Sequence, residues 1–276
     1  MNKKSHVASL IAGWAFLITV LVAIYLPLIM IILYSFSASR TVGGEFGNFT
    51  IVLYKNLLRD EELLAATKNS IVIGLVSAAI STIIGTIASI GIHYMRSKTK
   101  TVVDSASQIT IVNAEIVTAI GFFLFIVMLR DIINIPVNFG LPWLIITHVV
   151  ITTPYVILTV SPRLKQLNPN LLEASMDLGA GPMKSLVKVM LPQLAGAMVA
   201  AFALAFTLSL DDFVVTHINS TGASIETIST YVFTRIRKKM SLSIRALSTI
   251  IFTLVLSVLI IYNVAKNKKQ KQLTHK

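Results

Sequence analysis

The chain has 276 residues, of which 55% are hydrophobic and only 13% charged, and its mean hydropathy is +0.79. Soluble domains carry about 25% charged residues, so this chain has too few polar side chains to cover a water-facing surface. The composition predicts an integral membrane protein. Cysteine is absent, which excludes disulfides, thiolate metal sites and cysteine nucleophiles. The net charge of +12 lies in short basic blocks between apolar runs, a pattern that indicates an anionic membrane surface rather than nucleic acid.

Apolar runs long enough to cross a bilayer recur along the chain. A hydrocarbon core about 30 Å thick is crossed by roughly 20 apolar residues in a helix. Six runs reach that length, at residues 8–36, 69–94, 105–129, 139–161, 196–218 and 246–265. The first run follows Lys3 and Lys4, but it is longer than the apolar segment of a signal peptide and no cleavage site follows it. We therefore expect an anchor helix there.

These runs predict an all-α polytopic membrane protein with six transmembrane helices. We expect an N-terminal anchor helix and extracellular loop over residues 1–68, a transmembrane core over 69–265 and a basic tail over 266–276. With both termini in the cytoplasm, fourteen lysine and arginine residues fall inside and ten outside, although the external basic block 235–239 argues against this orientation. An even number of spans keeps the basic start and the basic tail on one side, so both termini are expected to be cytoplasmic.

Two features inside the runs concern packing. On the second run, Ser77, Ser81, Gly85 and Ser89 recur every four residues and form a ridge that lets helices of the chain approach closely. On the fourth run, His148 is interpreted as a packed histidine, or one bonded to a carbonyl, in preference to a proton relay.

The connection between the fourth and fifth runs is too structured for a simple turn. Residues 169–178 have apolar side chains at helical spacing, and Gly179 with Gly181 is expected to end this helix because glycine tolerates the left-handed conformation. Pro182 opens a second short helix with an apolar stripe, and Pro192 is expected to stop it just before the next span. An exposed apolar edge on such a helix–turn–helix suits docking on a protein partner; an interfacial helix lying on lipid is the alternative.

Within this connection, residues 162–192, the chain resembles a known signature. Permease subunits of binding-protein-dependent (type I) ABC importers carry the spaced pattern E-A-A, three residues, G, nine residues, I, one residue, L-P. The residues that match it with the same spacing are Glu173, Ala174, Ser175, Gly179, Val189, Leu191 and Pro192. The resemblance implies the fold of these permeases, with a cytoplasmic coupling helix that rests in a groove of a separate ATPase subunit.

Other stretches resemble the second permease subunit of spermidine/putrescine importers. They are FTLSLDDFVVTHI at residues 206–218, the following Ser224-Ile225-Glu226, and Tyr25-Leu26-Pro27 ahead of Tyr34-Ser35-Phe36. The resemblance implies a passive subunit for polyamine uptake across a bacterial plasma (inner) membrane. It also implies a second related permease, two cytoplasmic ATPase subunits and an extracellular substrate-binding protein that docks on outer loops including residues 222–243.

Acidic residues inside an apolar run are candidates for the solute path. Asp211 comes fifteen residues after Gly196, about 22 Å along a helix, so it and Asp212 are expected in the outer half of the fifth span. Adjacent helical residues point about 100° apart. One acid is therefore expected to face the path, and the other a neighbouring helix or a hydroxyl such as Thr207 or Ser209. Carboxylates at this depth suit a cationic solute; the alternative is that both are capped internally and shape a gate.

Glu115 on the third span is a further candidate for the same path. Permeases of the subgroup that the chain resembles often have a proline directly before this acid. Here Asn113 and Ala114 precede Glu115 instead, so we expect no proline kink at this point.

The sequence holds no machinery for ATP hydrolysis. The nearest approach to a phosphate-binding loop runs from Gly179 to Ser185, but no glycine directly precedes Lys184, Pro182 removes a backbone donor and no strand comes before it. We therefore expect no enzyme activity, no metal and no cofactor, with ATP bound by a partner subunit. The alternatives left open are a permease for ferric iron, thiamine, phosphonate or sugar, an ion-coupled secondary transporter, which intramembrane acids would also suit, and a membrane scaffold.

Overall fold

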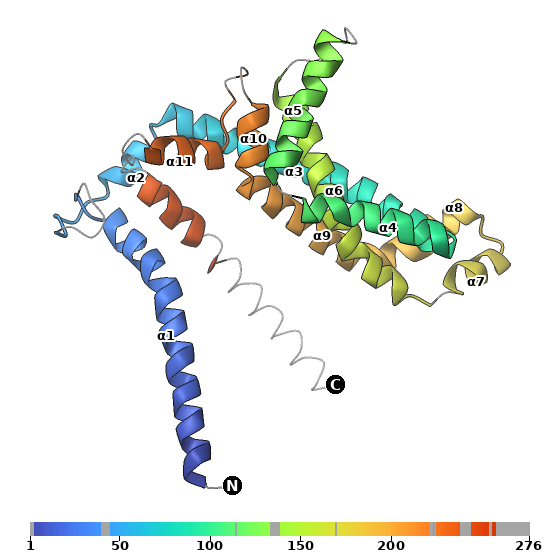
Figure 1. Cartoon of the computed structure of the whole chain (residues 1–276), viewed down its shortest axis with the longest axis horizontal. Coiled ribbons are helices and arrows are strands. Elements are labelled where there is room, and N and C mark those ends of the chain that lie inside the picture. Colours follow the sequence, from blue (N-terminus) through green and yellow to red (C-terminus); the bar gives the residue numbers. More distant parts are fainter. Residues whose placement is uncertain are drawn as a thin grey trace. The chain divides into compact units, whose positions relative to one another are not determined.

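The computed structural model describes residues 3–39, 45–113, 115–132, 139–168, 170–220, 223, 225–237, 244–253 and 256–257. These residues form helices joined by short connections, and the helices are labelled along the chain in Figure 1. The chain divides into two compact units, one made of Met1–Glu61 with Arg235–Lys276 and the other of Glu62–Thr234.

The first unit contains the long helix α1 (Lys3–Ser35) and the short helix α2 (Val52–Leu57). The most apolar stretch of α1, within Gly13–Ser35, has 0% of its residues buried, as suits a helix surrounded by lipid. At its end, the hydroxyls of Ser35 and Tyr54 lie 2.7 Å apart, and Phe36 stacks on Phe49 with 5.6 Å between ring centroids. These contacts fix α2 against the C-terminal end of α1.

The second unit is built on three long helices, α3 (Glu61–Tyr94), α6 (Leu141–Lys165) and α9 (Leu191–Asp211). Its central cluster of buried apolar side chains comes from all three and from the turn before α9, and consists of Ala78, Val156, Val160, Leu164, Met190, Leu194, Ala201 and Ala205. Five of its eight members are alanine or valine, so the helices meet through small side chains.

The predicted ridge on α3 is confirmed as a packing surface. Ser77, Ser81, Gly85 and Ser89 are all buried. A Cβ atom added to Gly85 would lie 2.6 Å from Cγ1 of Val156 on α6, closer than any side chain tolerates. In lipid, where no hydrophobic effect drives helices together, this close approach supplies the van der Waals contact that holds them.

Four helices among the described residues are long and apolar enough to cross a membrane: Gly13–Ser35, Glu61–Tyr94, Leu141–Lys165 and Pro182–Asp211. They correspond to the first, second, fourth and fifth predicted spans, and the all-α polytopic class is confirmed. Half of the sixth predicted span, 246–265, and all of the basic tail, 266–276, lie outside the described residues. The count of six spans, the domain boundaries and the orientation stay predictions.

The third predicted span, 105–129, is wrong as a single helix. The chain forms α4 (Ser97–Val112) and α5 (Glu115–Asp131), and Asn113 between them is extended, with φ −67° and ψ 143°. The expectation of no kink without proline also fails. The side chain of Asn113 donates from Nδ2 to Oγ1 of Thr118 (3.1 Å), a bond that spans the break, and asparagine is unfavourable in a helix interior.

The fifth predicted span, 196–218, ends earlier than expected. Helix α9 stops at Asp211, Asp212 is extended with ψ 123°, and the chain resumes as the short helix α10 (Val214–Asn219). The two acids therefore do not lie one after the other on a continuous helix, and the expected angle of about 100° between them does not apply. Aspartate favours helix ends because its carboxylate bonds backbone N–H groups there.

The connection between α6 and α9 has its predicted helix and turn, but its end differs. Helix α7 (Leu171–Asp177) is followed by Gly179 with φ +82°, and Pro182 opens α8 (Pro182–Ser185). Pro192 does not stop the helix, because α8 runs through a π-helical turn (Leu186–Met190) directly into α9. In this turn the N–H of Leu191 bonds the carbonyl of Leu186, and the wider turn takes the helix past Pro192, which lacks a donor.

Candidate functional site

A cavity of about 440 Å³ opens in the second unit where two helices are interrupted. One wall comes from the α4–α5 break, the second from α6, and the third from the α9–α10 break. Its lining residues are Ile111, Asn113, Glu115, Thr118, Ile151, Thr152, Tyr155, Leu208, Asp211, Asp212, Phe213, Val214 and Val215. All three acids singled out in the sequence thus border one cavity, and none of its described lining residues is basic.

Asp211 and Glu115 are the accessible acids of this cavity. Asp211 is the last residue of α9 and its side chain is exposed; within the described part of the chain it has no hydrogen-bond or ion-pair partner. Glu115 is the first residue of α5 and is also exposed. Both are therefore available to a solute.

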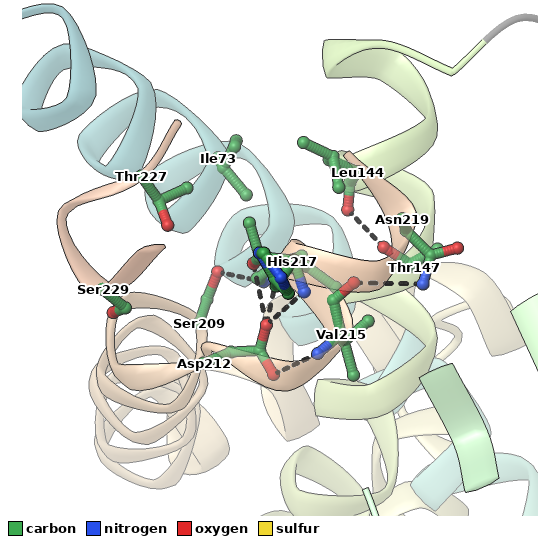
Figure 2. Close-up of polar contacts among 12 residues, drawn as sticks. Ile73, Leu144, Thr147, Ser209, Asp212, Val215, His217, Asn219, Thr227 and Ser229 are labelled. Carbon is green, nitrogen blue, oxygen red and sulfur yellow. Dashed lines mark hydrogen bonds and ion pairs between the residues drawn. The ribbon is translucent and has the colours of Figure 1, made fainter. Parts of the chain in front are cut away.

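Asp212 is held differently from its neighbour. Its carboxylate accepts hydrogen bonds from the backbone N–H of Val215 (3.3 Å), the backbone N–H of Thr216 (2.8 Å) and the hydroxyl of Thr216 (2.8 Å), as Figure 2 shows around its label. Its side chain is only 6% exposed. The carboxylate thus caps the first turn of α10, where it satisfies otherwise unpaired donors.

His148 on α6 lies fully buried behind Asp212. Its Nδ1 is 2.7 Å from Oγ of Ser209 and its Nε2 is 3.0 Å from Oγ1 of Thr216, with Oδ2 of Asp212 at 3.7 Å. His148 is packed, as expected; the carbonyl bond, the other form of that expectation, is not formed, because both ring nitrogens meet hydroxyls. One of the two acids, Asp212, bonds a hydroxyl as expected, but it is the hydroxyl of Thr216. Thr207 instead bonds the carbonyl of Ala203, and Ser209 meets His148.

Helix α10 is fixed at its other end by Asn219. The side-chain oxygen of Asn219 accepts from Nε1 of Trp143 on α6 (3.1 Å), and its Nδ2 donates to the carbonyl of Ala119 on α5 (3.1 Å). Asn219 is fully buried. Through this side chain α10 is pinned to both neighbouring helices, so the wall of the cavity at the α9–α10 break is well defined.

The segment after α10, which includes α11, packs against a residue that lines the cavity. Phe213, which lines it, packs against Phe233 of α11 (Ile228–Arg237) with ring centroids 4.0 Å apart. The start of α11 is fastened by Ser229, whose hydroxyl donates to the carbonyl of Leu210 (2.7 Å), and by Ile228, whose N–H donates to Oγ of Ser70 (2.7 Å). Of the basic block 235–239, residues 238 and 239 lie outside the described residues.

The connection between α6 and α9 exposes an apolar surface, as predicted. Leu178, Met183 and Val187 are 90%, 71% and 50% exposed, whereas Leu172 and Leu186 pack against the core cluster. Within the signature, Glu173, Ala174, Gly179 and Pro192 are exposed, and Ser175, Val189 and Leu191 are partly buried. The hydroxyl of Ser175 bonds that of Ser185 (2.8 Å), which holds α7 against α8.

Comparison with known proteins decides the family. Residues 81–267 match the family described as "Binding-protein-dependent transport system inner membrane component". The chain belongs to this family. Its members are membrane components of transport systems rather than enzymes, and the resemblance drawn from the signature at Glu173–Pro192 is confirmed. The ion-coupled transporter and the scaffold are thereby set aside.

Individual relatives match over most of the chain. The chain is 30% identical over 256 residues to the spermidine/putrescine transport system permease protein PotC of Escherichia coli (strain K12), covering 93% of this chain and 94% of that protein. It is 32% identical over 269 residues to the putrescine transport system permease protein PotI of the same strain, covering 96% and 92%.

A solved structure confirms the fold. A chain of a bacterial alginate ABC transporter, in complex with an alginate pentasaccharide-bound periplasmic protein, superposes with a TM-score of 0.69 at 15% identity, covering 94% of this chain and 93% of that chain. At this identity the likeness concerns the fold alone. The chain has the fold of ABC importer permeases.

Sequence reasoning missed several residues that build the site. Thr216 and Asn219 lie on α10, a short helix that was not predicted because a single long span was expected there. Tyr155 lies in an apolar stretch of α6. One signal was available: an aspartate inside an apolar run favours the start of a helix, where its carboxylate accepts from backbone N–H groups of the first turn, as Asp212 does from Val215 and Thr216.

Proposed function

We propose that this chain is the permease subunit of an ATP-driven importer and that it carries polyamines such as putrescine and spermidine into the cell. The observation that carries the proposal is the meeting of Asp211, Asp212 and Glu115 around one cavity whose described lining has no basic residue. The names of two relatives that align with more than 90% of the chain, a spermidine/putrescine permease and a putrescine permease, support the same solute class.

The chemistry of the lining fits an amine with several charges. Exposed carboxylates of Asp211 and Glu115 offer oxygens that can replace water around an ammonium group. Tyr155 and Phe213 add aromatic rings, which attract cations over their faces and also accommodate methylene chains. The cavity volume of about 440 Å³ lies within the usual range for small-molecule sites.

The energetic argument points to a cation as well. An ionised side chain near the centre of a bilayer costs roughly 2.5–3.5 kcal/mol on insertion scales. A cationic solute offsets that cost by pairing with the acids, whereas an anion such as a phosphonate would meet repulsion and a neutral sugar would leave the charges unpaired. Ferric iron, a cation, and thiamine, which carries one positive charge, remain competitors to be tested directly.

The partners are proposed from the surfaces. The exposed apolar side chains around Gly179 suit a groove on a cytoplasmic ATPase subunit, with Glu173, Ala174, Ser175, Val189, Leu191 and Pro192 completing the coupling segment. ATP would then be bound by that subunit. A second related permease would close the path from the other side, and an extracellular binding protein would dock on the outer segment that includes α11. This arrangement places both termini in the cytoplasm of a bacterial cell.

Uptake of radiolabelled putrescine and spermidine by a strain lacking the chain, with and without its restored copy, tests the proposal. Restored uptake that excess unlabelled polyamine abolishes, and that iron, thiamine, phosphonate and sugar leave unchanged, supports it. Competition by one of the other solutes alone would assign the permease to that solute. Purification of the restored transporter should also recover an ATPase; its repeated absence would contradict the ATP-driven mechanism.

A further inference from the structure

A buried chain of polar groups runs from the cavity into the helix bundle. It connects Asp212 after α9 with Thr216 on α10, His148 on α6 and Ser209 on α9 by the contacts of 2.7–3.0 Å given above. Oγ of Ser77 on α3 lies 3.2 Å from Oγ of Ser209 and extends the chain to a fourth helix. Except for Asp212, these side chains are at most 5% exposed.

The positions of the protons in this chain follow from counting donors. A carboxylate only accepts, and the Thr216 hydroxyl has a single proton, which it donates to Asp212. Oγ1 of Thr216 can therefore only accept from Nε2 of His148, so this nitrogen carries a proton. Thr216 thus has one side held by His148 and the other by Asp212, and it cannot turn without breaking both bonds.

The arrangement separates two acids that are adjacent in the sequence. Asp212 has three donors from α10 on its carboxylate, and a solute cation would have to compete with them. Asp211, one residue earlier, has an exposed carboxylate on the same cavity. We propose that Thr216 and His148 are positioning residues that hold Asp212 against α10 and leave Asp211 as the acid of the pair that meets the solute.

This inference rests on the proposed function in so far as the solute is a cation, but its geometry is testable without a solute. The assembled transporter in detergent is treated with a water-soluble carbodiimide and an amine, and the modified carboxyl groups are located by tandem mass spectrometry. We expect Asp212 to react roughly ten-fold or more slowly than Asp211, because hydrogen bonds to a charged group protect it. Equal rates in the unaltered protein would overturn the inference.

Variants then assign the protection to the positioning residues. Thr216→Val, which keeps the shape and removes the hydroxyl, should raise the rate at Asp212 several-fold, and Thr216→Ser should restore the protection. Thr207→Val is the matched control, because the Thr207 hydroxyl bonds only the carbonyl of Ala203 in its own helix. No change with Thr216→Val in an assembled transporter would also overturn the inference. If this variant does not assemble, the comparison of the two acids in the unaltered protein still decides.

Putrescine separates this inference from the proposed function. Added before the reagent, it should slow the modification of Asp211 and leave the rate at Asp212 unchanged, which supports both. If Asp212 is modified more slowly than Asp211 but neither putrescine nor spermidine slows the modification of Asp211, the positioning inference stands and polyamine transport is contradicted. Protection of Asp212 instead of Asp211 would overturn the positioning inference while supporting a cationic solute.

Discussion

The two ends of α9 are built in opposite ways. At its Asp211 end, the break at Asp212 is closed by hydrogen bonds within the chain, and the short helix beyond it is pinned by the buried Asn219. Beyond its other end, past the π-helical turn and α8, the turn at Gly179 leaves Leu178 and Met183 exposed, with no side chain of the described chain covering them. The first end is held by contacts within the described chain, whereas the second presents uncovered apolar side chains.

The largest effect on uptake should come from a change in the turn at Gly179, between α7 and α8. Gly179→Val places a β-branched residue at φ +82°, a conformation that such residues rarely adopt, so the turn between α7 and α8 should change shape. We expect near-complete loss of uptake with the chain still inserted in the membrane, measured by solute uptake, ATPase rate and membrane content.

Gly181→Val is the matched control for this change. Gly181 has φ −66° and ψ 158°, which any residue adopts, and nothing lies within 4 Å of an added Cβ. It should retain most of the transport. Wild-type transport by Gly179→Val would show that the turn does not couple the chain to a partner.

The next largest effect should be a loss of solute affinity when Asp211 is replaced. Asp211→Asn removes one charge from the cavity, and hydrogen bonds to a charged group contribute about 1.5–3 kcal/mol, so the KM of polyamine uptake should rise roughly ten- to one-hundred-fold. The thermal midpoint should not change, since the side chain has no bonded partner in the described chain. An unchanged KM with normal expression would remove Asp211 from the solute path.

A smaller effect should appear when the exposed apolar surface is made polar. Leu178→Ser removes an isobutyl side chain that is 90% exposed in the isolated chain, so the stability of the chain itself should not change. If a partner buries this side chain, the loss is about 1.5–3 kcal/mol of apolar contact, and binding of the ATPase should weaken at least several-fold. Pull-down of the ATPase at graded concentrations measures this. Unaltered binding would favour the alternative that the surface lies on lipid.

The smallest effect on uptake should come from replacing Asp212, at the break between α9 and α10. Asp212→Asn keeps the shape but replaces an acceptor by a donor beside Thr216, and loss of a helix cap costs about 0.5–2 kcal/mol. We expect a thermal midpoint lower by several degrees and a KM that changes less than in Asp211→Asn. Larger loss of solute affinity in Asp212→Asn than in Asp211→Asn would reverse the roles of the two acids.

The contrast also explains what the sequence could predict. Apolar runs and the glycine turn depend on local physics, namely transfer into lipid and backbone freedom, so four spans and Gly179 followed from residue type alone. The breaks at Asn113 and Asp212 depend on partners supplied by folding. A polar residue in an apolar run is compatible with a continuous helix until its neighbours are known.

The same limit applies to the candidate site. The acids could be chosen from the sequence because charge is costly in lipid, but their roles could not be separated. The difference between Asp211 and Asp212 arises from Thr216 and His148, of which one lies on an unexpected helix and the other 64 residues upstream of Asp212. Only the folded arrangement brings these groups within hydrogen-bonding distance.

The π-helical turn at Leu186–Met190 determines how far the segment before it is rotated about the helix axis relative to α9. Buried positions along this rod are four or seven residues apart in α9, at Leu194, Ala201 and Ala205, but Ser185 and Met190 on either side of the turn are five apart. The turn thus absorbs one extra residue, equivalent to about 100° of helix rotation. Deleting Lys188 would therefore rotate the exposed surface around the axis of α9 without altering Leu178, Met183 or Val187. The length of this segment, independent of its composition, determines which way the surface faces.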